Sequence, residues 1–165
     1  MNKHNTRLRA AFPARKRRTK PDFLLIDVSN SFTKLAFASR SRIERASKIT
    51  TSFLNAGKIA SILGRRDART VVVSSVVPKK NREIKRGARG REIIWLTAKT
   101  RLNVRIDYPN PGSIGADRLA NAVGVAELYG SPAIVIDFGT GGDIRHCGAG
   151  QRLHWGCDCT RDWKR

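Results

Sequence analysis

A carboxylate followed by small polar residues stands near the start of the chain and suits phosphate chemistry. Asp27 ends the apolar run 23–26, and the polar residues after Val28 favour a tight turn. A strand that ends in such a turn brings backbone N–H groups to a phosphate. Asp27 itself suits a hydrated metal ion nearby, because Mg²⁺ keeps several waters and takes few carboxylates. A capped hairpin with a surface lysine would show the same pattern. The candidate donors to phosphate oxygens are Asn30, Ser31 and Thr33, with Lys34 as a point charge.

A second group of chemically capable residues lies in the Gly-rich segment 108–118. Asp117 and Arg118 stand side by side at the predicted start of a helix. A carboxylate there can take a proton from a hydroxyl, and a guanidinium can bind an anionic substrate. The alternative is an acidic residue that favours the helix dipole beside a solvated arginine. Gly112 and Gly115 favour the functional interpretation, because glycine lets backbone come close to a ligand.

These two groups need elements to position them, and the chain alternates between strand-like and helix-like segments. Apolar and β-branched runs predict the strands, and apolar residues spaced along one helical face predict the helices. The order of these elements is that of an α/β fold. The predicted strands are 23–28, 33–38, 43–50, 70–77 (stopped by Pro78), 93–96, 104–106 and 133–138, and the predicted helices are 56–63 (ended by Gly64) and 117–129 (closed by Gly130).

The chain also contains one short sequence pattern that occurs twice. Residues 24–31 and 134–140 share one plan, an apolar strand, then Asp27 or Asp137, then one apolar residue and a small-residue turn. A strand that ends in Asp is common in α/β folds, which is the simpler explanation. Two copies favour a duplicated domain with two facing phosphate loops.

The chain is strongly basic, with 33 Lys+Arg against 13 Asp+Glu and a formal net charge of +20. Residues 1–20 hold eight basic side chains and no acidic one, and residues 63–91 hold ten basic against two acidic ones. One interpretation is a nucleic-acid-binding arm and patch. Aromatic residues are sparse in the arm and no DNA-binding motif stands out, so a disordered arm and a solvated basic helix or loop are favoured. A basic nucleic-acid-binding protein remains the alternative function.

The composition also predicts the compartment. No apolar run approaches the roughly 18 residues that a transmembrane helix needs. The first 20 residues have no apolar segment of the kind found in secretory signals. Three cysteines do not make a disulfide scaffold. We therefore expect a cytoplasmic protein without a membrane partner.

Four motifs together resemble the type III pantothenate kinase family, and their order and spacing match across residues 23–140. Ser29 stands where the family usually has Gly. The motifs are Ile26-Asp27-Val28-Ser29-Asn30-Ser31-Phe32-Thr33-Lys34, Val73-Ser74-Ser75-Val76-Val77-Pro78, Tyr108-Pro-Asn-Pro-Gly-Ser-Ile-Gly115-Ala116-Asp117-Arg118 and Asp137-Phe138-Gly139-Thr140.

The resemblance implies an actin-like, sugar-kinase (ribonuclease H-like) fold with a mixed sheet in its first domain. It implies transfer of the γ-phosphate of ATP to pantothenate, the first step of coenzyme A synthesis, with Mg²⁺ and a monovalent cation (K⁺ or NH₄⁺). It also implies a homodimer. By position, the resemblance makes Asp117 the general base and Asp137 the ligand of the monovalent cation. It assigns ATP contacts to Thr140 and to the turn residues Asp27, Asn30, Ser31, Thr33 and Lys34. It assigns pantothenate contacts to Tyr108, Gly115, Ala116, Asp117 and Arg118.

The resemblance stops after Thr140, where the family continues with a Thr-Phe-Asp strand and a Gly-Gly…Pro-Gly loop. Gly142 to Gly148 can be encoded GGT GAC ATT CGA CAT TGT GGN. Beginning at the second base gives GTG ACA TTC GAC ATT GTG, which encodes Val-Thr-Phe-Asp-Ile-Val. The same shift over 151–163 permits Asn-Gly-Tyr-Ile-Gly-Gly-Val-Ile-Ala-Pro-Gly. One extra G near the Thr140 codon explains both strings, so we expect an inactive, frameshifted product.

The predicted organisation therefore has four parts. They are a basic disordered arm at 1–22, a first actin-like kinase domain at 23–132, the first strand and phosphate turn of a truncated second domain at 133–140, and an out-of-frame tail at 141–165.

Overall fold

The computed structural model describes residues 21–107, 109–130, 132–137, 143–148 and 152–153. Most of the predicted arm lies outside this range, but its last two residues belong to the fold. The Asp22 amide donates to the Ala38 carbonyl at 2.9 Å, and the Thr70 amide donates to the Asp22 carbonyl at 3.3 Å. Pro21 is buried. Residues 21–22, predicted as the end of the arm, therefore pack with the first domain.

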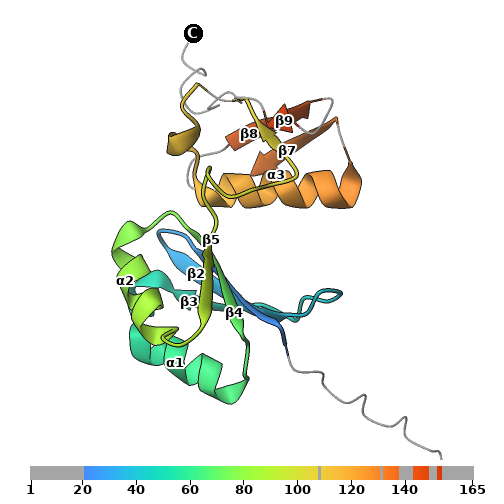
Figure 1. The fold of residues 1–165 in the computed structure, drawn as a ribbon. Helices are drawn as coiled ribbons and strands as arrows, with labels where there is room; N and C mark the ends of the chain where they lie inside the picture. The colour runs from blue at the N-terminus through green and yellow to red at the C-terminus, as the bar shows by residue number, and fades with distance from the viewer. Residues whose placement is uncertain (1–20, 108, 131, 138–142, 149–151, 154–165) are drawn as a thin grey trace, which may run out of the picture.

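Within the described residues, a mixed five-stranded sheet has the order β3-β2-β1-β4-β5 (Figure 1). The central strand β1 pairs antiparallel with β2 and parallel with β4, which confirms the predicted mixed sheet. The turn between β1 and β2 and the carboxyl end of β4 therefore lie at one edge of the sheet. The strands are β1 (Phe23–Val28), β2 (Phe32–Ala38), β3 (Ser47–Thr50), β4 (Thr70–Ser75) and β5 (Glu92–Trp95).

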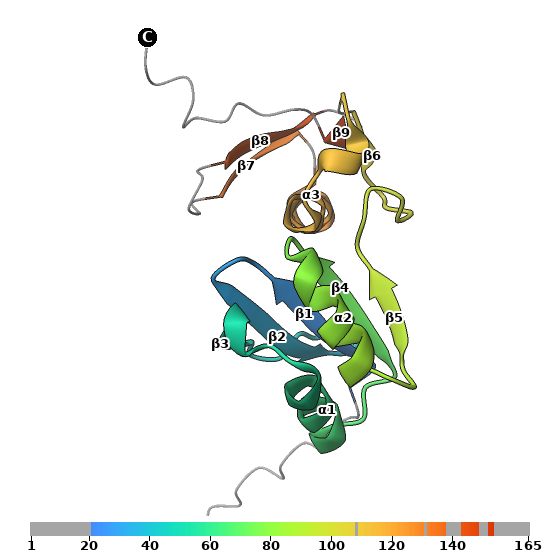
Figure 2. The same ribbon diagram turned by 90° about the vertical axis from the view of Figure 1, so that its left-hand side faces the viewer.

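The main core lies between this sheet and two helices that lie side by side, α1 (Ala56–Arg65) and α2 (Pro78–Gly87). Alternate β1 residues are buried because successive side chains point to opposite faces of a strand. Figures 1 and 2 show both helices on the same side of the sheet. The fully buried side chains of this core include Leu24, Ile26, Val71, Val73, Ile59 and Ile84.

The two helices correct the sequence prediction in their extents. Helix α1 starts where Asn55 accepts a hydrogen bond from the Lys58 amide at 2.9 Å, and it continues through Gly64 to Arg65. Helix α2 was predicted only as a solvated basic helix or loop within residues 63–91, without bounds. Pro78, expected only as the end of a strand, occupies the first turn of α2, where a missing N–H costs nothing. Ile84 is the one buried residue of α2, so the sequence shows no apolar period there.

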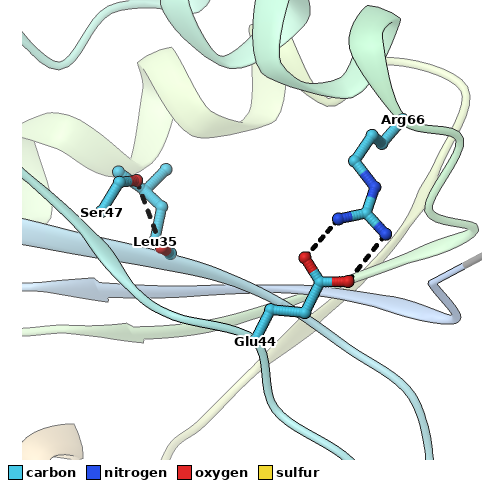
Figure 3. Close-up of polar contacts among 4 residues, drawn as sticks. All are labelled: Leu35, Glu44, Ser47 and Arg66. Carbon is cyan, nitrogen blue, oxygen red and sulfur yellow. Dashed lines mark hydrogen bonds and ion pairs between the residues drawn. The ribbon is translucent and has the colours of Figure 1, made fainter. Parts of the chain in front are cut away.

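The end of β2 away from the β1–β2 turn is tied to α1 by charge (Figure 3). Arg66 follows α1 and binds Glu44 with both terminal guanidinium nitrogens. Nη2 donates to Oε1 at 2.8 Å, and Nη1 donates to Oε2. The hydrogen bond to Glu44 raises the pKa of Arg66 above its usual value. The guanidinium also lies over the Phe37 ring, 4.8 Å from its centroid. Nearby, the Ser47 hydroxyl donates to the Leu35 carbonyl at 3.3 Å.

A second, smaller layer follows in the chain. Helix α3 (Ala116–Tyr129) lies between the five-stranded sheet and a small sheet of order β6-β9-β8-β7 (Figure 2). The helix buries Leu119, Ala122 and Ala126 against Val104 and Ile114. No helix in the described part of the chain is long and apolar enough to cross a membrane. The remaining elements are β6 (Arg105–Ile106), the 3₁₀ helices η1 (Thr51–Phe53) and η2 (Pro111–Ser113), β7 (Ala133–Asp137), β8 (Asp143–Gly148) and β9 (Arg152–Leu153).

Strands β8 and β9 lie inside the segment expected to be out of frame. β8 pairs antiparallel with β7, and β9 pairs with β8 and β6. A strand ladder is made by backbone groups, so a strand can form there whichever side chains the frame encodes. In the shifted frame the positions of β8 begin Thr-Phe-Asp-Ile-Val, which is also a strand-forming sequence.

Candidate functional site

The turn after β1 is a tight hairpin connection with an exposed tip. The β1–β2 register pairs Val28 with Thr33, and the Ser29 amide donates to the Phe32 carbonyl at 3.1 Å. Asn30 and Ser31 form the tip, and both are exposed. Two of the predicted phosphate donors are therefore presented to solvent at the carboxyl end of β1.

Thr33 differs from the other predicted donors because its side chain points into the protein. It is fully buried, and its hydroxyl lies 3.0 Å from the Thr51 hydroxyl. A hydroxyl in that position supports the turn from inside. The sequence could not show this, because Thr51 is distant in the chain and becomes a neighbour only through the pairing of β2 with β3.

A polar row crosses the sheet at the level of Asp27. Asp27 pairs with Lys34 on β2 and with Ser74 on β4, so the three side chains share one face of the sheet. The Ser74 hydroxyl donates to Asp27 Oδ1 at 3.2 Å. Asp27 is half-buried and Lys34 is exposed. This set of oxygen donors fits a hydrated hard cation such as Mg²⁺, which takes one or two carboxylates and keeps its waters.

The second predicted constellation forms the amino end of α3. Gly115 is the residue before the helix, and Asp117 lies in its first turn, where the helix dipole stabilises a negative charge. Asp117 Oδ1 accepts a hydrogen bond from the Arg118 amide at 2.8 Å. A Cβ at Gly115 would collide with Asp117 Oδ1, so glycine lets the carboxylate fold back over this position. Asp117 and Arg118 are half-buried, and Ala116 is buried.

Val76 joins these two regions. Its amide donates to the Val28 carbonyl at 3.0 Å, directly before the turn of β1. A Cβ built on Gly115 would lie 3.5 Å from Val76 Cγ1. The amino end of α3 therefore lies at the edge of the sheet where β1 and β4 end. Asp27 and Asp117 both lie at Gly- or Ser-rich turns next to apolar elements, and from this the sequence predicts that they face one cleft. That stays a prediction, and this arrangement is what it requires.

Of three further predicted site residues, two lie outside the described part of the chain and the third is described by its backbone alone. Tyr108 and Thr140 lie outside the described residues. Asp137 is the last residue of β7, and its backbone pairs with Asp143 of β8. Sequence reasoning in turn missed Ser74, Val76 and Thr51. The two serines that interrupt the apolar run 70–77 were the available signal for Ser74, whereas Thr51 offered none.

Comparisons with known proteins agree on one family. The sequence profile of a family described as "Type III pantothenate kinase" matches residues 23–152, so the match continues past Thr140, where the resemblance was predicted to stop. The chain is 41% identical over 120 residues to the type III pantothenate kinase of Methylacidiphilum infernorum, covering 71% of this chain and 43% of that protein. It is 40% identical over 119 residues to that of Akkermansia muciniphila, covering 72% and 49%. The chain thus spans about half the length of the curated relatives it matches.

Proposed function

Because the chain belongs to the type III pantothenate kinase family, we propose that residues 23–137 supply the first half of a site that transfers the γ-phosphate of ATP to pantothenate. The observation that supports this best is the common edge of the sheet. The turn after β1 and the amino end of α3 meet there through Val76. Phosphoryl transfer depends mainly on positioning and charge stabilisation, so a phosphate-binding turn beside a fixed carboxylate is the arrangement it needs.

Asp117 is assigned the role of general base. It would take the proton of the pantothenate hydroxyl as that oxygen attacks the phosphorus. Its Oδ1 is held by the Arg118 amide, so Oδ2 is the oxygen that we assign to the proton. Arg118, in the same turn, is assigned to the pantothenate carboxylate, because guanidinium and carboxylate groups match in geometry.

The turn after β1 is assigned to ATP. Asn30, Ser31 and the turn amides would donate to phosphate oxygens, and Lys34 would contribute positive charge. Asp27, held by Ser74, would take the hydrated Mg²⁺ that accompanies ATP and screens its negative charge. Thr33 is moved from this group to the support of the turn, because its hydroxyl is buried against Thr51.

The remaining roles rest on the family resemblance. Asp137 would hold the monovalent cation, K⁺ or NH₄⁺, and Thr140 would contact ATP. Tyr108, Gly115 and Ala116 would contact pantothenate, the last two through backbone. The complete enzyme would be a cytoplasmic homodimer.

The frameshift at about residue 141 is also proposed. Two strings typical of the family come from one shifted frame in the right order. Resequencing the gene around the Thr140 codon tests this directly. A clean sequence with no family motif in the shifted frame would refute the frameshift.

The function itself is tested by comparing two proteins. One is the 165-residue chain, and the other is the product of the gene with one G removed near the Thr140 codon. Pantothenate-dependent ADP formation is measured in each with Mg²⁺, and with K⁺, NH₄⁺ or Na⁺. We expect background rates from the first protein and cation-dependent turnover from the second. Full activity of the 165-residue chain would contradict the frameshift, and no activity in the repaired protein would contradict the proposed function.

A further inference from the structure

Thr51 is bound to the phosphate-binding turn by two hydrogen bonds. Its hydroxyl donates to the Ser29 carbonyl at 2.7 Å, and its amide donates to the Ser31 carbonyl at 3.0 Å. The side chain is 3% exposed. Hydrogen bonds away from water hold their partners in fixed orientations, because breaking one leaves an unsatisfied buried group.

Thr33 completes this arrangement from the other side. Its hydroxyl lies 3.0 Å from Thr51 Oγ1. A hydroxyl has one proton, and that of Thr51 is given to the Ser29 carbonyl, so Thr33 is the donor in this pair. The result is a relay of two buried hydroxyls that ends on the backbone of the turn.

The 3₁₀ helix η1 that contains Thr51 is itself held in place. The Lys80 ammonium, from α2, donates to the Ser52 carbonyl at 3.0 Å and to the Leu54 carbonyl at 2.9 Å. The Leu54 amide donates to the Thr51 carbonyl at 3.1 Å, and the Leu54 side chain is fully buried. Thr51 therefore acts on the turn from a position fixed by α2 and by the core.

The geometry of the peptide bond links the Thr51–Ser29 hydrogen bond to the direction of the Asn30 N–H. In a planar trans peptide the carbonyl and the following N–H point in opposite directions. With the Ser29 carbonyl directed at Thr51, the Asn30 N–H is directed away from it. We propose that Thr51, supported by Thr33, is a positioning residue that orients the Ser29–Asn30 peptide so that the Asn30 N–H meets a phosphate oxygen. This inference rests on the proposed function, because it takes the turn to be the phosphate site.

The first test uses the 165-residue chain and does not depend on kinase activity. Thr51→Val keeps the shape of the side chain and removes the hydroxyl, and Thr51→Ser keeps the hydroxyl. Thr70→Val is the matched control, because Thr70 is a buried threonine at the other end of the sheet whose hydroxyl donates to Glu92 at 2.9 Å. Amide NMR spectra are recorded with and without millimolar Mg²⁺–tripolyphosphate.

We expect tripolyphosphate to shift the Asn30 amide resonance in the wild-type chain, in Thr51→Ser and in Thr70→Val. In Thr51→Val we expect this shift to be lost while the resonances of the β1 core stay in place. Thr33→Val should weaken the shift in the same direction. An Asn30 amide that responds equally in wild type and Thr51→Val would overturn the inference, and so would one that ignores tripolyphosphate in the wild-type chain.

The second test uses the frame-repaired protein. Thr51→Val should raise the KM for Mg²⁺–ATP about tenfold with a smaller change in kcat, as expected for a lost contact that orients the ground-state complex. Thr51→Ser should restore most of this loss. An equal fall in kcat for Thr51→Val and Thr70→Val would show a general structural effect and contradict the positioning role. A repaired wild-type protein without kinase activity would refute the proposed function, whereas the amide test of Thr51 would still be decided by its own result.

Discussion

Strands β1 and β7 share one sequence plan but occupy different surroundings. Leu24 and Ile134 hold equivalent places in that plan, yet Leu24 is 0% exposed and Ile134 is 65% exposed. β1 is the central strand of its sheet, with β2 on one side and β4 on the other. Among the described strands β7 pairs with β8 alone. An apolar strand followed by Asp therefore does not determine burial, which depends on the neighbours that the rest of the chain supplies.

The difference also separates the two candidate phosphate turns. The turn after β1 is bound by Thr51 and lies against Val76, which contacts the amino end of α3. The residues directly after β7, 138–142, lie outside the described part of the chain. The matched part of this chain covers 43% and 49% of the two relatives named above.

The largest difference is expected when the equivalent residues of the two strands are truncated. Leu24→Ala should lower the free energy of unfolding by about 2–5 kcal/mol, because it opens a cavity in a closed core. Ile134→Ala should lower it by less than about 1 kcal/mol, because that side chain is mostly in water. Urea denaturation of the 165-residue chain, followed by circular dichroism, measures both. Equal losses would mean that β7 is buried as deeply as β1.

The next largest effect is expected at the edge shared by β1 and β4. In the frame-repaired enzyme, Asp117→Asn should lower kcat on the order of 10²-fold or more, because an amide cannot accept the hydroxyl proton. Glu127→Gln is a matched control on the same helix, where Glu127 is exposed and accepts a hydrogen bond from Asn103 at 2.7 Å. Steady-state kinetics should show little change for this control. Near-normal turnover in Asp117→Asn would overturn the role assigned to Asp117.

A smaller effect is expected at Gly115, whose lack of a side chain leaves room for the Asp117 carboxylate. Gly115→Ala should lower kcat about tenfold, because the added methyl group displaces Asp117 Oδ1 and small misplacements of a catalytic group are costly. Gly124→Ala is the control, since a Cβ at Gly124 meets no atom within 4 Å. The two variants are compared in the same kinetic assay. If Gly115→Ala kept full kcat, the close approach at Gly115 would have no part in orienting the base.

Much of this architecture follows from local sequence patterns, because those patterns reflect burial. The β-branched run 70–77 and the apolar run 23–26 predict strands, and both form the centre of the sheet. The bounds of helix α2 were not predicted, because Ile84 is its one buried residue and its charged positions show no repeating apolar spacing. A shared cleft for Asp27 and Asp117 was predicted from the Gly- or Ser-rich turns at which they lie, and it stays a prediction.

The site residues divide in a similar way. The sequence identified Asn30, Ser31 and Asp117 because polar residues of these types stand in a predicted turn or at a predicted helix start. Thr33 was assigned to phosphate because its type allows it, but strand alternation places its side chain inside the protein. Thr51 and Val76 were beyond prediction, since their roles come from contacts made across the sheet.

The smallest effect is expected at the opposite end of β2, where Arg66 ties α1 to Glu44. Arg66→Lys should lower the free energy of unfolding by about 0.5–1 kcal/mol, because a lysine gives up the two-pronged hydrogen bond and the contact with Phe37. The pair is partly exposed, with 20% and 30% of the two side chains accessible, so water screens the charge–charge attraction. A raised Arg66 pKa supports folding at all pH values below the ordinary arginine range and is lost only above it. Between pH 6 and 9 the difference in the free energy of unfolding between Arg66→Lys and wild type should therefore stay constant in urea denaturation.

The frame-repaired Arg66→Lys enzyme should keep its KM for Mg²⁺–ATP, because this end of the hairpin is remote from the Ser29–Ser31 turn. A raised KM would mean that the two ends of β2 are coupled, and that β1 owes its ordered turn to the whole hairpin rather than to Thr51.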